Sequence, residues 1–234
     1  MKLSDFTGVL QKHTLPLMRS YEADDDCTVF EFDITGMDVI WKPGQHGIFT
    51  LPEKDVTGTK WRAFSVSSIP SEGMLQIATK ISIEPSSFKV ALRSLQPGEN
   101  IQIQGPFGWL YLRDHNSPVV MIAGGVGITP FRALFKELEQ VNHRDVTLIY
   151  SSRDTYLFKS ELDEIAENDP KIKIVYTHTK EEVDAALSKT LESASSDTDY
   201  FISGTPGMVS GISKTLKAGG VPKKDIITDS FKGY

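Results

Sequence analysis

The sequence predicts two domains: a small antiparallel β-barrel followed by a doubly wound α/β domain with a parallel sheet. Up to about residue 114, short strand patterns are separated by turn residues, with one helical interruption. From Pro118 onward, strand patterns alternate with helical ones, which is typical of a parallel sheet covered by helices. We place the boundary after residue 115, which gives domains of residues 1–115 and 116–234.

Five strand patterns and one helix define the predicted barrel. Residues 27–34 alternate between apolar and polar side chains, as expected for a half-buried strand. A short apolar repeat after Ser86 and Ser87 predicts a short helix with a serine N-cap. The remaining strands are expected at residues 47–51, 62–66, 74–81 and 101–103.

A glycine turn opens the second domain. Five consecutive apolar residues, 119–123, predict a strand buried on both faces. The following turn places Thr129 as a helix N-cap and Pro130 at the first helical position. Glycines allow a ligand to approach the backbone and a helix N-terminus favours phosphate, so the turn predicts a phosphate site. A turn without a ligand stays open as the alternative, because Pro130 replaces the third glycine of the G-x-G-x-x-G fingerprint.

The rest of this domain continues the alternation of strands and helices. Four further strands are expected at residues 146–150, 172–177, 200–203 and 226–228. The four helices are expected at residues 131–141, 158–166, 181–191 and 207–217.

Composition excludes several function classes. The net charge of −6 argues against nucleic acid as the main partner, because binding its phosphates requires basic patches. The single cysteine, Cys27, excludes an internal disulfide and cannot hold a typical iron–sulfur cluster. The five histidines show no metal-ligand spacing and suggest no Ser-His-Asp triad, so we expect no metal. No apolar run approaches the ~20 residues of a membrane span, and no signal peptide is evident, so we expect a cytoplasmic protein.

Five motifs resemble those of the ferredoxin–NADP reductase family in order and spacing, and the likeness covers nearly the whole sequence. They are Arg62-Ala63-Phe64-Ser65, Gly105-Pro106-Phe107-Gly108, Gly124-Gly125-Val126-Gly127-Ile128-Thr129-Pro130, Ser203-Gly204-Thr205-Pro206-Gly207-Met208 and Asp229-Ser230-Phe231-Lys232-Gly233-Tyr234. The resemblance implies a six-stranded Greek-key barrel that binds FAD and a nucleotide domain that binds NAD(P). The two cofactors would meet in the cleft between the domains.

For FAD, the resemblance implies roles for the segment Arg62 to Ser65. Arg62 would pair with the flavin pyrophosphate, since its planar fork suits phosphate oxygens. Phe64, where Tyr is commoner, would lie along the isoalloxazine, with Ala63 beside it and the Ser65 hydroxyl reaching flavin N5. A second anion site is expected at the short helix from Ser86, Ser87 and Lys89. Among the histidines, only His46 lies in a segment near the expected flavin.

For the nicotinamide nucleotide, the resemblance implies binding by the glycine turn and by the motif after the fourth strand of this domain. Ser203 stands where the family has Cys, beside nicotinamide C4, and keeps a small polar group there. The expected binding residues are Gly124, Gly125, Val126, Gly127, Thr129, Pro130, Gly204 and Met208. Ser152 and Arg153 suit a 2′-phosphate, whereas the neighbouring Asp154 suits a free 2′-hydroxyl, so NADPH is favoured and NADH stays open.

Two aromatic residues at the chain end are expected to contact FAD. Relatives end in Glu-x-aromatic, and Asp229-Ser230-Phe231 fits this pattern with Asp for Glu. Phe231 would cover the isoalloxazine and Tyr234 would stack on the adenine, although the motif also permits Tyr234 to take the first position. The residues expected to act in catalysis are Ser65, Ser203 and Phe231.

The function implied is a reductase that moves hydride from NAD(P)H to bound FAD and then passes single electrons to an external acceptor. That acceptor would be a ferredoxin, a flavodoxin or a partner oxygenase, because the chain has no cluster of its own. An acidic ferredoxin would need a basic rim, expected from Lys60, Arg62, Lys80, Lys89 and Arg93. Two alternatives remain: a reductase that uses free flavin as substrate, and a nucleotide-sensing module without catalysis.

Overall fold

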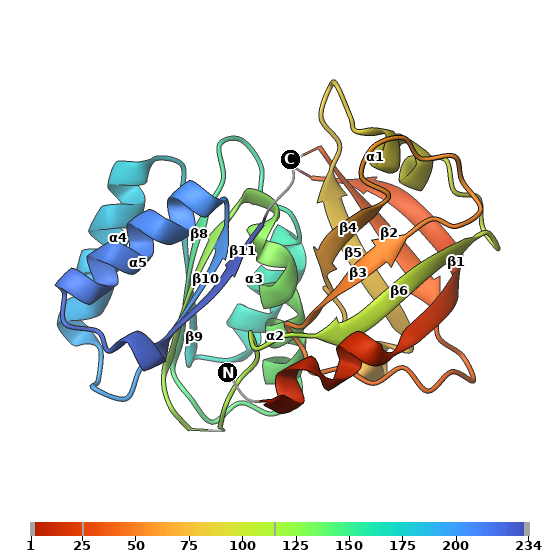
Figure 1. The fold of residues 1–234 in the computed structure, drawn as a ribbon. Helices are drawn as coiled ribbons and strands as arrows, with labels where there is room; N and C mark the ends of the chain where they lie inside the picture. Colours follow the sequence, from red (N-terminus) through yellow and green to blue (C-terminus); the bar gives the residue numbers. More distant parts are fainter. Residues whose placement is uncertain (1–2, 25, 115, 232–234) are drawn as a thin grey trace.

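The computed structural model describes residues 3–24, 26–114 and 116–231 and contains the two predicted sheets (Figure 1). A six-stranded antiparallel sheet is followed along the chain by a five-stranded parallel sheet flanked by helices. The predicted fold class is therefore confirmed. His115 and Tyr234 lie outside the described residues.

The first sheet curls into a barrel with the strand order β4-β3-β6-β1-β2-β5. Its two end strands approach each other where the Ser67 N–H, just after β4, donates to the Gln76 carbonyl of β5 at 2.8 Å. Helix α1 (Ser87–Arg93) covers one side of the apolar core with the fully buried Phe88, and Ser86 is its N-cap as predicted. The strands are β1 (Lys12–Ala23), β2 (Cys27–Asp33), β3 (His46–Thr50), β4 (Trp61–Ser65), β5 (Met74–Lys80) and β6 (Asn100–Phe107).

Strand β1 was not predicted from the residue pattern. It pairs with β6 through residues 12–16 and with β2 from Leu17 onward, with a bulge between Leu17 and Arg19. Pro16, which has no N–H to donate, lies at the last pair of the β1–β6 ladder. The change of partner and the bulge break the two-residue period by which a strand is recognised. Two short 3-10 segments, η1 (Leu3–Leu10) and η2 (Pro70–Glu72), complete this part of the chain.

The parallel sheet has the strand order β11-β10-β7-β8-β9, with helices on both faces. Helices α2 and α3 lie between this sheet and the barrel, and α4 and α5 cover the outer face (Figure 1). All predicted strands and helices of this part are present. The strands are β7 (Val119–Gly124), β8 (Val146–Ser151), β9 (Ile172–Thr177), β10 (Asp199–Gly204) and β11 (Ile226–Ser230). The helices are α2 (Thr129–Gln140), α3 (Lys159–Asn168), α4 (Lys180–Ser193) and α5 (Pro206–Ala218), and the 3-10 segments are η3 (Gly125–Ile128) and η4 (Lys223–Asp225).

The glycine turn differs from the prediction in one respect. The 3-10 segment η3 runs directly into α2, so Ile128 takes the N-cap position and the prediction that Thr129 is the N-cap was wrong. The reason is that η3 already brings the backbone into a helical conformation before Thr129, which leaves no extended residue there to act as a cap. The Thr129 hydroxyl instead donates to the Val126 carbonyl at 3.0 Å.

Arg132 of α2 joins the two parts of the molecule. Its side chain is 6% exposed and forms ion pairs with Glu72 of η2 at 2.8 Å and with Glu161 of α3 at 2.7 Å. It also donates to the Ser67 carbonyl at 2.7 Å. Because a buried guanidinium needs all of these partners, the barrel and the α/β part are held in one arrangement. None of the described helices is long and apolar enough to cross a membrane.

Candidate active site between the barrel and the parallel sheet

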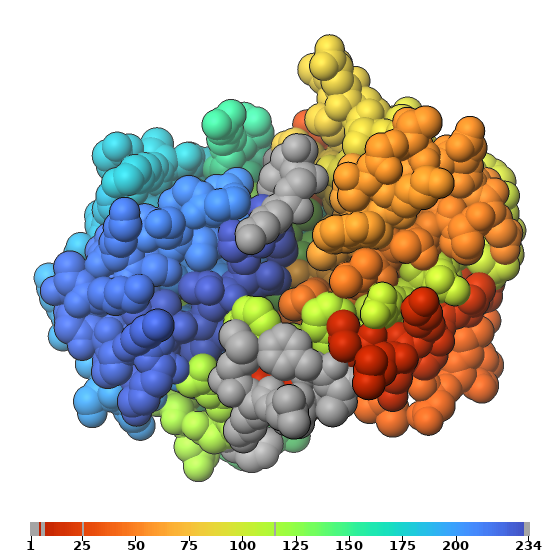
Figure 2. Space-filling model, in the orientation of Figure 1, coloured from red at the N-terminus to blue at the C-terminus, as the bar shows by residue number. Residues whose placement is uncertain are grey.

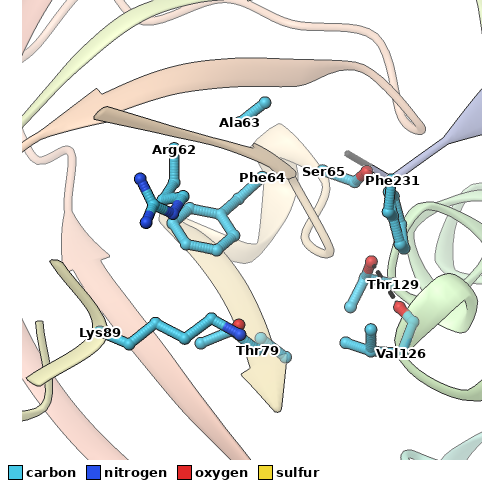
Figure 3. Close-up of a pocket in the computed structure, with 10 residues that line it drawn as sticks. Arg62, Ala63, Phe64, Ser65, Thr79, Lys89, Val126, Thr129 and Phe231 are labelled. Atoms are coloured by element: carbon cyan, nitrogen blue, oxygen red, sulfur yellow. Dashed lines mark hydrogen bonds between the residues drawn. The ribbon is translucent and has the colours of Figure 1, made fainter. Parts of the chain in front are cut away.

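The barrel packs directly against the α/β part on the face shown in Figure 2. Three neighbouring cavities lie where they meet. The first is lined from the barrel by residues 62–65, Thr79 and Lys89, and from the opposite side by Val126, Thr129 and Phe231 (Figure 3). The sequence motifs are thus brought together from both domains.

Arg62 of β4 provides a positive group in the first cavity. Its Nη1 donates to the carbonyls of Thr59 at 3.0 Å and Trp61 at 2.8 Å, and its guanidinium lies 5.5 Å from the centroid of the Phe88 ring. Its Nε is buried and has no hydrogen-bond partner among the described residues. A buried N–H of a cation without a partner is costly, so this donor suits an anionic ligand.

Lys89 of α1 is the second cation of this cavity. The residue is 7% exposed, and its ammonium donates to the Lys80 carbonyl at 2.6 Å. Burial lowers the pKa of Lys89, and the nearby charge of Arg62 lowers it further. Two neighbouring cations that repel each other favour an anion between them.

Ser86 and Ser87, the other predicted members of the anion site, do not line the cavity. The Ser86 hydroxyl caps α1 by accepting from the Lys89 N–H, and the Ser87 hydroxyl accepts from the Thr57 N–H at 3.0 Å. Both hydroxyls are therefore engaged in holding the helix start and the neighbouring loop.

Phe64 and Ser65 separate the first cavity from a second one of about 400 Å³. The Phe64 ring packs on Phe49 at 5.6 Å between centroids. The Ser65 hydroxyl donates to the carboxylate of Asp229, 164 residues away in sequence, at 2.9 Å. Burial raises the pKa of Asp229, while the charge of His46 and the Ser65 hydrogen bond oppose that rise.

Phe231 follows β11 and lines both of these cavities, as expected for an aromatic cover. Its N–H donates to the Gly204 carbonyl at 3.0 Å, which holds Phe231 beside β10. Figure 3 shows its ring on the side of Ser65 and Thr129. The predicted contact of Tyr234 falls outside the described residues.

The third cavity, of about 430 Å³, lies at the carboxyl ends of the parallel strands. Gly124, Gly125 and Val126 line it together with residues 151–154, so Ser152 and Arg153 lie beside the glycine turn. Ser152 is 6% exposed, whereas Arg153 and Asp154 are exposed. Strand ends at such an edge are where open α/β sheets bind ligands.

The remaining residues predicted to bind the nucleotide pack closely around the glycine turn. A Cβ on Gly127 would lie 2.4 Å from the Ser203 carbonyl oxygen, and one on Gly124 would lie 2.2 Å from Met208 Sδ. Gly204 also packs against Met208, and Pro130 is buried in the first turn of α2. These residues do not line the cavities, apart from Gly124.

Ser203 is fully buried, and its hydroxyl has no hydrogen-bond partner among the described residues. It does not line any of the three cavities in this arrangement. An unsatisfied buried hydroxyl carries an energetic cost, which is typical of groups kept for a ligand or for function.

Several lining residues were not singled out from the sequence. Trp61 and Trp109 line the second cavity and Thr79 the first. Trp61 adjoins Arg62, and Trp109 follows the Gly105-Pro106-Phe107-Gly108 motif. Their position next to a motif is the signal by which the sequence could have identified them. His46, noted only for its segment, lines the second cavity with Asp229.

Comparison with known proteins gives a matching domain model, distant relatives and a shared fold. The oxidoreductase NAD-binding domain family matches residues 121–214. The chain is 29% identical over 208 residues to a subunit of the Na(+)-translocating NADH-quinone reductase of Yersinia pestis, covering 77% of this chain and 51% of that protein. The protein of the same name in Neisseria meningitidis is 27% identical over 199 residues, covering 74% of this chain and 49% of that protein. The chain thus spans about half the length of the curated relatives it matches.

Two solved structures show the same fold over almost the whole chain. The cytochrome P450 reductase of Amycolatopsis has a TM-score of 0.81 at 18% identity, covering 95% of this chain and 70% of that one. The ferredoxin-NADP+ reductase of Plasmodium falciparum with 2'P-AMP has a TM-score of 0.80 at 17% identity, covering 94% and 96%.

Proposed function

We propose that this chain, an oxidoreductase with the two-domain fold of the ferredoxin–NADP reductase family, is an NAD(P)H-dependent flavoprotein reductase that passes electrons to an external acceptor. The relatives named as part of an NADH-quinone reductase and as a ferredoxin-NADP+ reductase support this class of reaction. FAD would supply the chemistry, because it accepts hydride and can release electrons one at a time. The domains are proposed to meet at residues 115 and 116.

The observation that carries the proposal is the pair of cations in the first cavity. The unbonded buried Nε of Arg62 and the buried ammonium of Lys89 fit the pyrophosphate of FAD. Ser86 and Ser87 would contribute indirectly by fixing the start of α1. The residues present therefore fit the group that the fold implies.

The flavin ring is proposed to lie along the wall that the first and second cavities share. Phe64 and Phe231 offer aromatic surfaces, and the small side chain of Ala63 lines both cavities. Ser65 presents a hydroxyl that Asp229 orients. Such a wall would exclude water from one face of the flavin ring. On the other face, a nicotinamide ring could displace the Phe231 ring.

NAD(P)H is proposed to bind in the third cavity, with its phosphates at Gly124, Gly125 and Val126. Thr129 would orient the nicotinamide end, since it lines the first cavity and lies one helical turn beyond the glycines. Ser203, Gly204 and Met208 would pack against the glycine turn and hold it in position. Arg153 is accessible to a 2′-phosphate, which supports the preference for NADPH.

The acceptor is proposed to be a one-electron carrier of the ferredoxin or flavodoxin class or a partner oxygenase. The structure corrects the expected basic rim, because Lys89 is buried on the Lys80 carbonyl and Arg62 lines the cavity. The exposed cations left from that set are Lys60 and Arg93, with Lys80 partly exposed. Docking of an acidic protein would thus depend on few charges.

Purification and anaerobic reduction test the proposal. The purified chain should carry about one FAD per molecule, and NADPH or NADH should bleach the flavin absorbance within one turnover. A colourless chain that reduces added free flavin would instead indicate a free-flavin reductase. A chain that binds nucleotide without any flavin reduction would refute the proposed function.

A further inference from the structure

Three strands bring His46, Ser65 and Asp229 to one cavity. His46 of β3 and Ser65 of β4 are directly opposite each other in the antiparallel ladder, so their side chains lie on the same face of the sheet. Asp229 of β11 reaches this face from the other domain and accepts the Ser65 hydroxyl at 2.9 Å. All three line the second cavity, together with Trp61, Trp109 and Phe231.

The His46 ring is held in place by its neighbours. It meets Phe107 edge-on at 4.7 Å between centroids and Trp109 at 6.3 Å. Gly108 has a φ of 119°, and a Cβ there would lie 2.9 Å from the Nδ1 and Cε1 atoms of His46. The backbone therefore leaves space for the imidazole. None of the described residues forms a hydrogen bond with the His46 ring.

Among the described residues that line the second cavity with His46, Asp229 is the charged one. The side chains that face it from β4, β6 and the following loop are Ser65, Phe107 and Trp109, none of which is charged at neutral pH. From β11, Asp229 is the charged group. Burial lowers the pKa of His46 and Asp229 counteracts this, while burial raises the pKa of Asp229 and His46 counteracts that in turn.

We propose that His46 is a positioning residue whose proton balances the charge of Asp229 across the second cavity and thereby controls how firmly the C-terminal strand and Phe231 are held over the cavity. With the proton present, the pair has no net charge and Asp229 keeps its contact with Ser65. After the proton is lost, a buried carboxylate remains with Ser65 as its hydrogen-bond donor, and such a charge favours movement toward water. This inference rests on the proposed function, because Phe231 controls access of the nicotinamide there.

The sign of the pH effect follows from this arrangement. Raising the pH through the titration of the pair loosens Phe231, which opens the cavity to the nicotinamide. Lowering the pH closes it. Binding of NADP+ to the parent should therefore tighten as the pH rises, and the slope should vanish when residue 46 cannot carry the proton.

Proton NMR of the histidine ring tests the charge interaction between His46 and Asp229 directly. In the full-length chain, Asp229→Asn should lower the pKa of His46, because the opposite charge is removed. Asp229→Glu keeps the charge and should restore the parent value.

Nucleotide binding tests the consequence. The dissociation constant of NADP+ should vary with pH in the parent and lose this dependence in His46→Asn, with circular dichroism to verify folding and His46→Gln as the substitute if Asn does not fold. An unchanged His46 titration in Asp229→Asn, or the same pH profile in parent and His46→Asn, would overturn the inference. A parent that binds no nucleotide refutes the proposed function, and the NMR comparison still decides whether the charge of Asp229 acts on His46.

Discussion

Replacement of Arg62 by Ala is expected to cost the chain most of its affinity for FAD. In the structure, two hydrogen bonds to the Thr59 and Trp61 carbonyls fix the guanidinium, and its buried Nε is left for a ligand. A charge-assisted hydrogen bond of this kind contributes ~2 to 3 kcal/mol. That loss corresponds to a dissociation constant that is roughly 30- to 150-fold higher.

Two further variants separate the charge from the geometry. Arg62→Lys keeps a cation but loses the planar fork, so its affinity should fall between the parent and Arg62→Ala. Lys60→Ala removes an exposed charge two residues away and should keep FAD. Circular dichroism and thermal unfolding establish that each variant is folded, since Arg62 also bonds to its own strand.

The assay is FAD content after gel filtration, followed by titration of FAD into the stripped protein. The reasoning would be refuted if Arg62→Ala bound FAD as tightly as the parent, or if Lys60→Ala lost it to the same extent. In the first case the pyrophosphate lies elsewhere, and in the second the effect reflects overall charge rather than a bond.

Four other changes have defined outcomes. Arg153→Ala should raise the Michaelis constant for NADPH and leave that for NADH nearly unchanged; equal effects would remove the case for a 2′-phosphate site. Arg132→Met should destabilise the fold by about 3 kcal/mol in urea unfolding, because Glu72 loses its buried partner. Hydrogen bonds to Ser117 lower the pKa of Asp114 to about 2, so its contribution to stability is present above its ordinary pKa, is lost as the pH falls from about 4 to 2, and should be absent in Asp114→Asn. Phe231→Ser should tighten binding of the oxidised nucleotide and slow turnover, as measured by titration and steady-state kinetics; unchanged values would show that the ring does not cover the flavin.

The fold was predictable because local patterns dominate most of the chain. The buried strand of residues 119–123 and the helix after it come from periodicity and from the glycine turn, which are short-range signals. Strand β1 was not predicted because its pairing partner changes at Leu17, so neither half of the strand has a long alternating pattern. A strand that pairs with two different strands depends on contacts with both of them. A local sequence pattern carries no information about such contacts.

The site was predictable in part. Arg62, Phe64, Ser65 and Phe231 line the cavities as their motifs indicate. The hydrogen bond between Ser65 and Asp229 joins residues 164 positions apart, and no local pattern encodes such a contact. Lys89 was assigned to both an anion site and a basic rim, and only its burial distinguishes the two roles.

The glycine turn shows why residue type alone leaves a motif ambiguous. Gly124 and Gly125 line the third cavity, where close approach of the proposed nucleotide would favour glycine. Gly127 has a different cause, because a Cβ there would meet the Ser203 backbone carbonyl at 2.4 Å, and a backbone atom cannot move aside. At Gly124 the obstacle is the flexible Met208 side chain, which can shift. Packing of β10 against η3 therefore requires Gly127 even without a ligand, whereas the proposed nucleotide would favour glycine at positions 124 and 125.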